Sequence, residues 1–194
     1  MIKSLVESLL PVIGYDKTHI TRTVAYREID RLLDALGTET HDALEISAGW
    51  KWRARAWNSF SEMNWPEYDI CEHRLDRQFD IIIADNVFEH LKYPYRAAQN
   101  VRAMLKSGGY FINITPFMIR HHPIPLDCSR WTQEGMRYFL EEVGFDPEKI
   151  TTGGWGNAAA VRANMHRWAR TGWKRNPPND PNFPVTIWAI AEHS

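Results

Sequence analysis

The sequence has few cysteines, no excess of charge of either sign and no long apolar run. Its two cysteines, Cys71 and Cys128, have no metal-type spacing, so we expect reduced thiols in a cytoplasmic protein. The formal net charge of -1 gives no overall attraction to nucleic acid or to a membrane surface. The apolar stretch over residues 5–13 is broken by Glu7 and Pro11, and no run approaches the roughly 20 residues of a membrane span. Neither a secretory signal nor a membrane anchor is expected.

Segments with helical and with strand-like patterns alternate along most of the chain. Residues 50–63 are ambiguous, since Trp57 and Phe60 suit either a short helix or the start of a strand. We expect helices over residues 1–10, 24–36, 95–106, 155–170 and between Thr132 and Gly144, and strands over 43–49, 60–64, 79–84, 110–115 and 185–191.

The β-branched run Ile81-Ile82-Ile83 indicates a strand that is buried on both faces, as in a parallel sheet under helices. We therefore predict an α/β fold with a mostly parallel central sheet and helices on both faces. Such sheets bind ligands beyond the carboxyl ends of their strands. That edge is predicted to include residues 47–51, 64–69, 85–90 and 116–130.

One strand and its turn, Leu44-Glu45-Ile46-Ser47-Ala48-Gly49, resemble the first motif of class I S-adenosylmethionine-dependent methyltransferases. In that motif small residues let the cofactor lie against the backbone, and the acidic residue either holds the turn or attracts the cofactor's ammonium group. The resemblance implies S-adenosyl-L-methionine as the cofactor, with contacts from Glu45, Ser47, Ala48 and Gly49. This chain keeps one of the family's two or three glycines.

A second segment, residues 79–91, looks like the fourth-strand motif of the methyltransferase type 11 group. The helix that ends near Ser107-Gly108-Gly109 and the strand that ends at Thr115-Pro116 follow in the family's order. The resemblance covers residues 40–150 and includes the loop over residues 122–132. It implies a Rossmann-like class I methyltransferase fold, with Asp85 and Asn86 as further cofactor contacts.

The interval between the two motifs is short, so one element of the family's fold, a helix, is expected to be reduced or missing. The family places an acid after its second strand to hold the ribose, and Asn64 occupies that position here. Glu62 and Glu67 are alternatives for the same role. Asp69 resembles the later acid that meets the adenine amino group.

A hydroxyl or protonated amine acceptor needs a general base. The candidates on the ligand-side loops are His90, His121, His122 and Asp127, and His90 is favoured because it closely follows the strongest strand. Packing or capping is the alternative role. The predicted catalytic residues are His90, His122 and Asp127, and the predicted acceptor-binding residues are His121, Arg130 and Trp131. No metal site is predicted, since His121, His122 and Asp127 lack a further evident ligand.

The sequence thus predicts one methyltransferase domain over residues 1–194, with an N-terminal helical cap (1–40) and a helical insertion (151–184) before the last strand. The expected function is methyl transfer to a small-molecule or saccharide-related acceptor. Residues 155–179 contain Arg162, Arg167, Arg170, Lys174 and Arg175 and no acid. A solvated basic face or a subunit contact is the favoured interpretation of this segment, and binding of an anionic acceptor is the sharper hypothesis. The rivals are a non-catalytic scaffold on the same fold and, less favoured, a nucleic-acid methyltransferase. Whether the chain forms a homodimer is left open.

Overall fold

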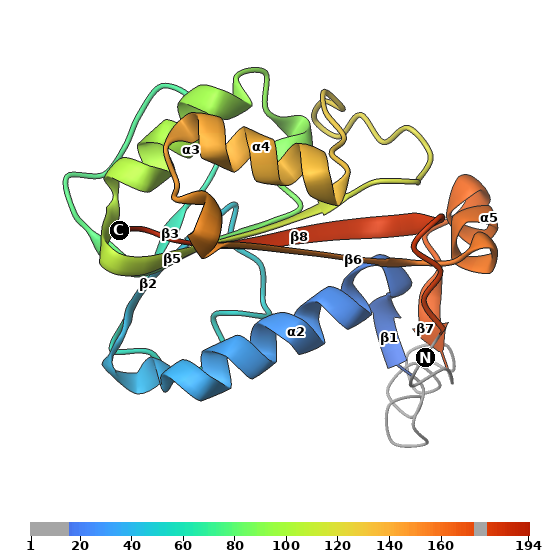
Figure 1. Cartoon of the computed structure of the whole chain (residues 1–194), viewed down its shortest axis with the longest axis horizontal. Coiled ribbons are helices and arrows are strands. Elements are labelled where there is room, and N and C mark those ends of the chain that lie inside the picture. The colour runs from blue at the N-terminus through green and yellow to red at the C-terminus, as the bar shows by residue number, and fades with distance from the viewer. Residues whose placement is uncertain (1–15, 173–177) are drawn as a thin grey trace, which may run out of the picture.

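The computed structural model describes residues 16–172 and 178–194, and its centre is a six-stranded sheet (Figure 1). The strands lie in the order β3-β2-β4-β5-β8-β6. Their bounds are β2 Asp42–Ile46, β3 Ser59–Met63, β4 Phe79–Asp85, β5 Leu105–Pro116, β6 Ile150–Gly156 and β8 Pro184–Glu192.

The sheet is mostly parallel, as predicted. β2 pairs in parallel with β3 and β4, and β4 pairs in parallel with β5. Only β8 runs the other way, between β5 and β6. The carboxyl ends of β2, β3, β4 and β5 therefore meet at one edge, where open α/β sheets place their ligands.

Helices cover both faces of the sheet, so the predicted fold class is confirmed (Figure 1). Helix α2 (Ile20–Leu36) covers one face and buries Ile29 and Leu33 in an apolar cluster that also contains Ile81 and Ile83 of β4. Helices α3 (Pro94–Ala103) and α4 (Gln133–Val143) cover the opposite face. No helix in residues 16–172 or 178–194 is long and apolar enough to cross a membrane.

Several predicted caps are present. Helix α2 ends at Gly37, which has a left-handed φ of 69°, and α4 ends at Gly144 with φ 104°. The Thr132 hydroxyl begins α4 by accepting a hydrogen bond from the Gly135 backbone N at 2.9 Å. Helix α2 begins at Ile20, four residues before its predicted start.

The prediction for the region after residue 150 was wrong about strand β6 and about the helix that follows it. Strand β6 was missed because Thr151, Thr152 and two glycines do not give an apolar alternation. A Cβ on Gly153 would lie 2.3 Å from the Trp188 ring, so close packing of β8 explains the glycine. The predicted helical insertion therefore begins with a strand of the main sheet.

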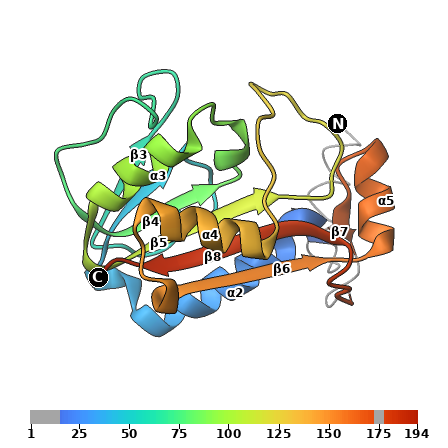
Figure 2. The ribbon, with the colours of Figure 1, turned by 45° about the horizontal axis from the view of Figure 1, so that its top comes forward.

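Helix α5 (Ala158–His166) is shorter than predicted, and a different face of it is buried. Its buried residues are Ala160 and Asn164, whereas Met165 of the predicted stripe is exposed and Trp168 lies beyond the helix. The helix packs against the end of the sheet rather than over its face (Figure 2).

Helix α3 also ends earlier than predicted, at Ala103, and the following Gly108 and Gly109 belong to β5. The Gly108 backbone N donates a hydrogen bond to the His193 carbonyl O at 2.6 Å. A Cβ on Gly109 would lie 2.9 Å from the Asp80 carbonyl O. These glycines are explained by close contacts with His193 and with β4. They do not mark the end of a helix.

Residues 64–78, between β3 and β4, contain neither helix nor strand, in agreement with the predicted reduction of one element. A second sheet pairs β1 (Asp16–His19) with β7 (Arg170–Gly172) in antiparallel fashion. The region predicted as an N-terminal helical cap (1–40) therefore contains strand β1, and its helix α2 covers one face of the main sheet. The helix expected over residues 1–10 lies outside the described residues.

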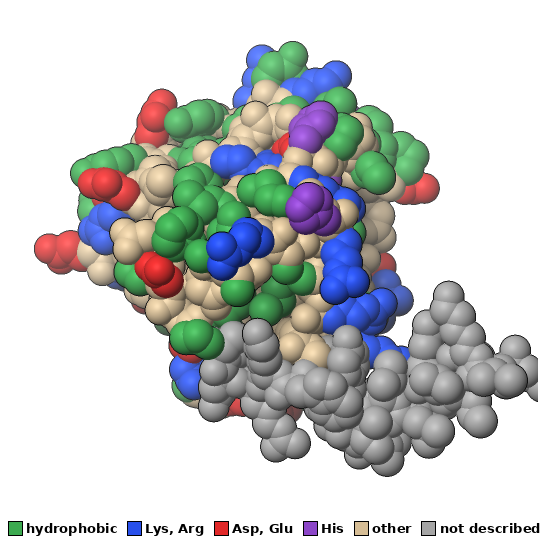
Figure 3. Space-filling model, turned by 90° about the vertical axis from the view of Figure 1, so that its right-hand side faces the viewer, with side chains coloured by type: hydrophobic (Ala, Val, Ile, Leu, Met, Phe, Trp, Pro, Cys, Tyr) green, Lys and Arg blue, Asp and Glu red, His purple; other side chains and the backbone are tan. Residues whose placement is uncertain are grey.

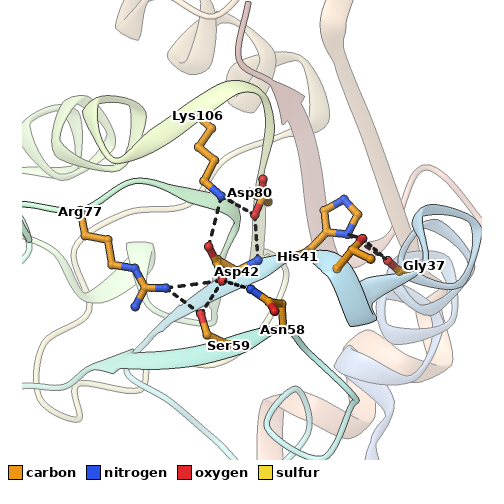
Figure 4. A network of polar contacts seen from close by, with 9 residues as sticks. Gly37, His41, Asp42, Asn58, Ser59, Arg77, Asp80 and Lys106 are labelled. Carbon is orange, nitrogen blue, oxygen red and sulfur yellow. Dashed lines mark hydrogen bonds and ion pairs between the residues drawn. The ribbon is translucent and has the colours of Figure 1, made fainter.

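A polar network joins the amino ends of β2, β4 and β5, at the edge opposite the expected site (Figure 4). The Lys106 Nζ lies 2.8 Å from an Asp80 oxygen and 3.2 Å from an Asp42 oxygen. Hydrogen bonds from Ser59, Asn58 and Lys106 hold the pKa of the Asp42 carboxyl well below its usual range. The network fixes strand ends and leaves the carboxyl edge free for a ligand.

Candidate functional site

A cavity of about 500 Å³ opens at the carboxyl ends of β2, β3 and β4. Its walls are mainly apolar, with polar groups where the strands end. The lining residues are Ile46, Ser47, Met63, Trp65, Tyr68, Asp69, Ile70, Cys71, Asn86, Val87, His90, Leu91, Lys92, Tyr93, Pro125 and Leu126.

The turn after β2 is held in a fixed shape by two hydrogen bonds. The Gly49 backbone N donates to Glu45 Oε1 at 3.0 Å, and the Ala48 backbone N donates to Asn64 Oδ1 at 2.8 Å. Ser47 has a left-handed φ of 55°, which turns the chain sharply at the cavity wall. Of the two roles considered for the acid of this motif, the structure shows that Glu45 holds the turn.

Glu45 also retains an unsatisfied carboxylate oxygen. The side chain is 1% exposed, and its Oε2 atom has no hydrogen-bond partner. Burial raises the pKa of Glu45 to about 7, against the lowering effect of the Gly49 N–H, and Asp85 and Glu62 raise it further. A buried acid of this kind favours a positively charged group near it.

The two residues predicted to hold the nucleoside lie at different positions relative to the cavity. Asn64 is outside its lining, and its amide supports the turn and donates from Nδ2 to Glu62 Oε2 at 3.3 Å. Asp69 lines the cavity, and its Oδ1 accepts a hydrogen bond from the Cys71 backbone N at 2.9 Å. A ribose contact by Asn64 and an adenine contact by Asp69 stay predictions.

Asp85 and Asn86 end β4 in different roles. The Asp85 carboxylate accepts hydrogen bonds from the Tyr26 hydroxyl and the Asn86 amide, and one oxygen lies 3.4 Å from Arg22 Nε. It therefore clamps β4 to α2 and lies outside the cavity lining. Asn86 has a left-handed φ of 55° and lines the cavity. Sequence reasoning missed Tyr26 and Arg22, because α2 carries no motif that identifies them.

A smaller cavity of about 190 Å³ adjoins the first, and the two share Asn86 and His90. Its walls come from β1, α2, η2 (Phe88–His90), β5 and the loop after it. The lining residues are His19, Thr21, Arg22, Asn86, Glu89, His90, Pro116, His122 and Trp168. The structure thus brings the predicted catalytic His90 and His122 together.

Glu89 is a further buried acid beside these histidines. It is fully buried, and neither carboxylate oxygen has a hydrogen-bond partner. Burial raises the pKa of Glu89 to about 8, partly offset by its own backbone N–H and by Arg130. Sequence reasoning overlooked Glu89, although it stands next to His90 in the fourth-strand motif.

The two histidines contact each other directly. Their ring centroids lie 4.9 Å apart and the rings are perpendicular. The His90 Nδ1 atom is hydrogen-bonded to the Leu126 carbonyl O. Burial lowers the pKa of His122, and His90 lowers it further. A neutral imidazole suits either a base or a ligand.

The remaining predicted residues line neither cavity. Asp127 binds Arg130 through both oxygens and accepts a hydrogen bond from the His122 backbone N at 2.9 Å. Burial alone would raise the pKa of Asp127, but hydrogen bonds from Arg130 and His122 lower it overall. The His121 side chain is 73% exposed, and Trp131 packs against Phe139. Asp127 and Arg130 shape the loop that carries His122.

The comparisons with known proteins agree with this geometry. Residues 21–111 match a family model described as a methyltransferase domain. A search of curated protein sequences gives no match. This match and the shared fold support the predicted resemblance to class I S-adenosylmethionine-dependent methyltransferases, a family that implies S-adenosylmethionine as the cofactor.

Solved structures show the same fold at low sequence identity. A S-adenosylmethionine-dependent methyltransferase from Clostridium acetobutylicum is 9% identical with a TM-score of 0.55, over 100% of this chain and 98% of that one. One from Archaeoglobus fulgidus is 13% identical with a TM-score of 0.53, over 88% and 94%. Phosphoethanolamine N-methyltransferase 2 from Haemonchus contortus is 11% identical with a TM-score of 0.56, over 87% and 52%.

Proposed function

We propose that this protein transfers the methyl group of S-adenosylmethionine to a small-molecule or saccharide-related acceptor. The observation that carries the proposal is the pair of adjoining cavities that share Asn86 and His90 at the carboxyl edge of the sheet. The larger cavity suits the cofactor and the smaller one an acceptor. A shared wall would allow the two bound molecules to meet, which an in-line transfer needs.

The residues of the larger cavity fit the cofactor. Of the small residues at the turn after β2, Ser47 lines the cavity, which supports close approach of a ligand to the backbone there. The Glu45 Oε2 atom, which has no hydrogen-bond partner, is buried beside the same turn. Ile46, Met63 and Val87 give the cavity an apolar wall, which would help to exclude water once the cofactor is bound. When bound, S-adenosylmethionine supplies an activated methyl group on a sulfonium, so the protein chiefly has to position the two molecules.

The smaller cavity holds the groups that would handle the acceptor. Arg22, which is paired with Asp85, presents a cation in its wall, and His90 and His122 present imidazole nitrogens. These features support an acceptor that carries a negative charge and an ionisable hydroxyl or amine. Solved neighbours include a phosphoethanolamine N-methyltransferase and a glycopeptide N-methyltransferase, in keeping with such acceptors.

The outer rim of this end of the molecule is basic. Arg162, Arg167 and Arg170 are exposed on and after α5. The face to which α5 and β7 belong carries a band of Lys and Arg side chains beside histidines (Figure 3). The predicted contribution of Lys174 and Arg175 lies outside the described residues. An anionic acceptor would be attracted to this rim.

Calorimetry with S-adenosylmethionine and with its demethylated product tests the proposal. We expect one site per chain with a micromolar dissociation constant, about -8 kcal/mol. Acceptor candidates are then screened for formation of the demethylated product, and His90→Gln is expected to lower kcat more than cofactor affinity. Absence of cofactor binding would favour the non-catalytic scaffold instead.

A further inference from the structure

Three side chains able to ligate a metal ion meet beside the smaller cavity. One oxygen of Glu89 and one ring nitrogen each of His90 and His122 all lie within 4.8 Å of one another. Glu89 and His90 are adjacent in η2, whereas His122 comes from the loop after β5. That loop is anchored to η2, because the Cys128 backbone N donates to the Glu89 carbonyl O at 2.7 Å. The grouping is therefore fixed by main-chain contacts.

The polar atoms of this cluster lack partners. Both carboxylate oxygens of the fully buried Glu89 and the buried Nε2 of His122 have no hydrogen bond. Unpartnered buried polar atoms are costly and rare, and a bound ion is one of the usual reasons for them. Three such atoms on two neighbouring side chains point to a bound ligand.

His90 is oriented as a metal ligand. Its Nδ1 must donate to the Leu126 carbonyl O, which can only accept, and in the neutral form of the ring the lone pair is then on Nε2. The Nε2 atom lies 3.6 Å from Glu89 Oε1. Metal-bound histidines typically donate their other ring N–H to a backbone carbonyl or a carboxylate in this way.

Two guanidinium groups near the cluster have carboxylate partners. Arg22 pairs with Asp85 at 3.4 Å, and Arg130 binds both oxygens of Asp127. A divalent ion at the cluster would therefore meet two guanidinium groups that already have carboxylate partners, together with the Glu89 carboxylate, whose oxygens have no hydrogen bond.

We propose that Glu89, His90 and His122 form a binding site for a divalent transition-metal ion, with an open coordination position in the smaller cavity. Two imidazoles and one carboxylate suit Zn²⁺, Fe²⁺ or Mn²⁺. Bonds of about 2.1 Å separate neighbouring ligands by roughly 3 Å, so small side-chain rotations complete the site. The open position would orient an acceptor oxygen, a role that rests on the proposed function, whereas ion binding itself does not. The sequence did not suggest this set, because His122 is far from the other two in the chain.

The test is a titration of the whole chain, stripped with a chelator and kept reduced, with Zn²⁺ alone in a calorimeter. We expect one ion per chain, and we expect His122→Gln and Glu89→Gln each to weaken Zn²⁺ binding by about 10- to 100-fold or more. His121→Gln is the matched control, because the neighbouring His121 side chain is 73% exposed and outside the cluster. Its affinity should equal that of the wild type.

Thermal unfolding supplies a second readout. Zn²⁺ should raise the Tm of the wild type and of His121→Gln but not that of His122→Gln. If Glu89→Gln does not fold, His122→Gln and His90→Gln carry the test. Failure of the wild type to bind Zn²⁺, or equal losses from His121→Gln and His122→Gln, would overturn the site. So would a Co²⁺ thiolate absorption that disappears in Cys128→Ser. No cofactor is present, so these results are independent of S-adenosylmethionine binding.

Discussion

Replacement of the buried Glu45 by glutamine should change how stability depends on pH. In the folded chain the carboxyl has a pKa of about 7, against an ordinary value of 4.5, and the side chain is 1% exposed. Between these values the folded protein holds a proton that the unfolded chain releases, so stability falls as pH rises through this window. A difference of about 2.5 pKa units corresponds to about 3 kcal/mol.

Glu45→Gln removes this titration and keeps the shape of the side chain. Its amide oxygen can still accept the hydrogen bond from the Gly49 backbone N. Urea unfolding of the cofactor-free wild type and variant from pH 4.5 to 8 gives the difference in their free energies of unfolding. That difference should shift by about 3 kcal/mol in favour of the variant as pH rises. The titration of Glu89 contributes equally to the free energy of unfolding of both proteins, so it cancels in their difference. Parallel pH curves would refute the reasoning about Glu45.

Three further changes test the site and the fold. Gly49→Asp should abolish calorimetric binding of the demethylated cofactor, since it sets a second carboxylate beside Glu45, whereas Gly49→Ala should bind, because its Cβ would meet nothing closer than 3.7 Å. Lys106→Met should lower the urea-derived free energy of unfolding by about 1 kcal/mol, and no loss would mean that the amino-end network is fully solvated. Arg167→Glu with Arg170→Glu should raise the KM of an anionic acceptor in steady-state assays; a KM insensitive to the reversal and to salt would indicate a neutral acceptor.

The local sequence pattern was sufficient to predict those helices and strands whose conformation depends mainly on their own residues. The β-branched run of β4 has to be buried on both faces, and the glycines at 37 and 144 end helices through their left-handed conformation. Local pattern failed where a distant neighbour decided the conformation. The β6 glycine at 153 is explained by Trp188 of β8, which sequence spacing does not reveal.

The sequence by itself determined the class of fold, the first turn and the position of the ligand edge, because these depend on hydrophobic period and on strand ends that precede small or polar residues. Only the tertiary structure decided which side chains share a cavity. It separated Asp85 from the cavity by pairing it with Tyr26 and Arg22, and it placed His122 beside Glu89. The physical reason is that loop conformation and helix packing bring together residues from distant segments, and no local pattern encodes those distances.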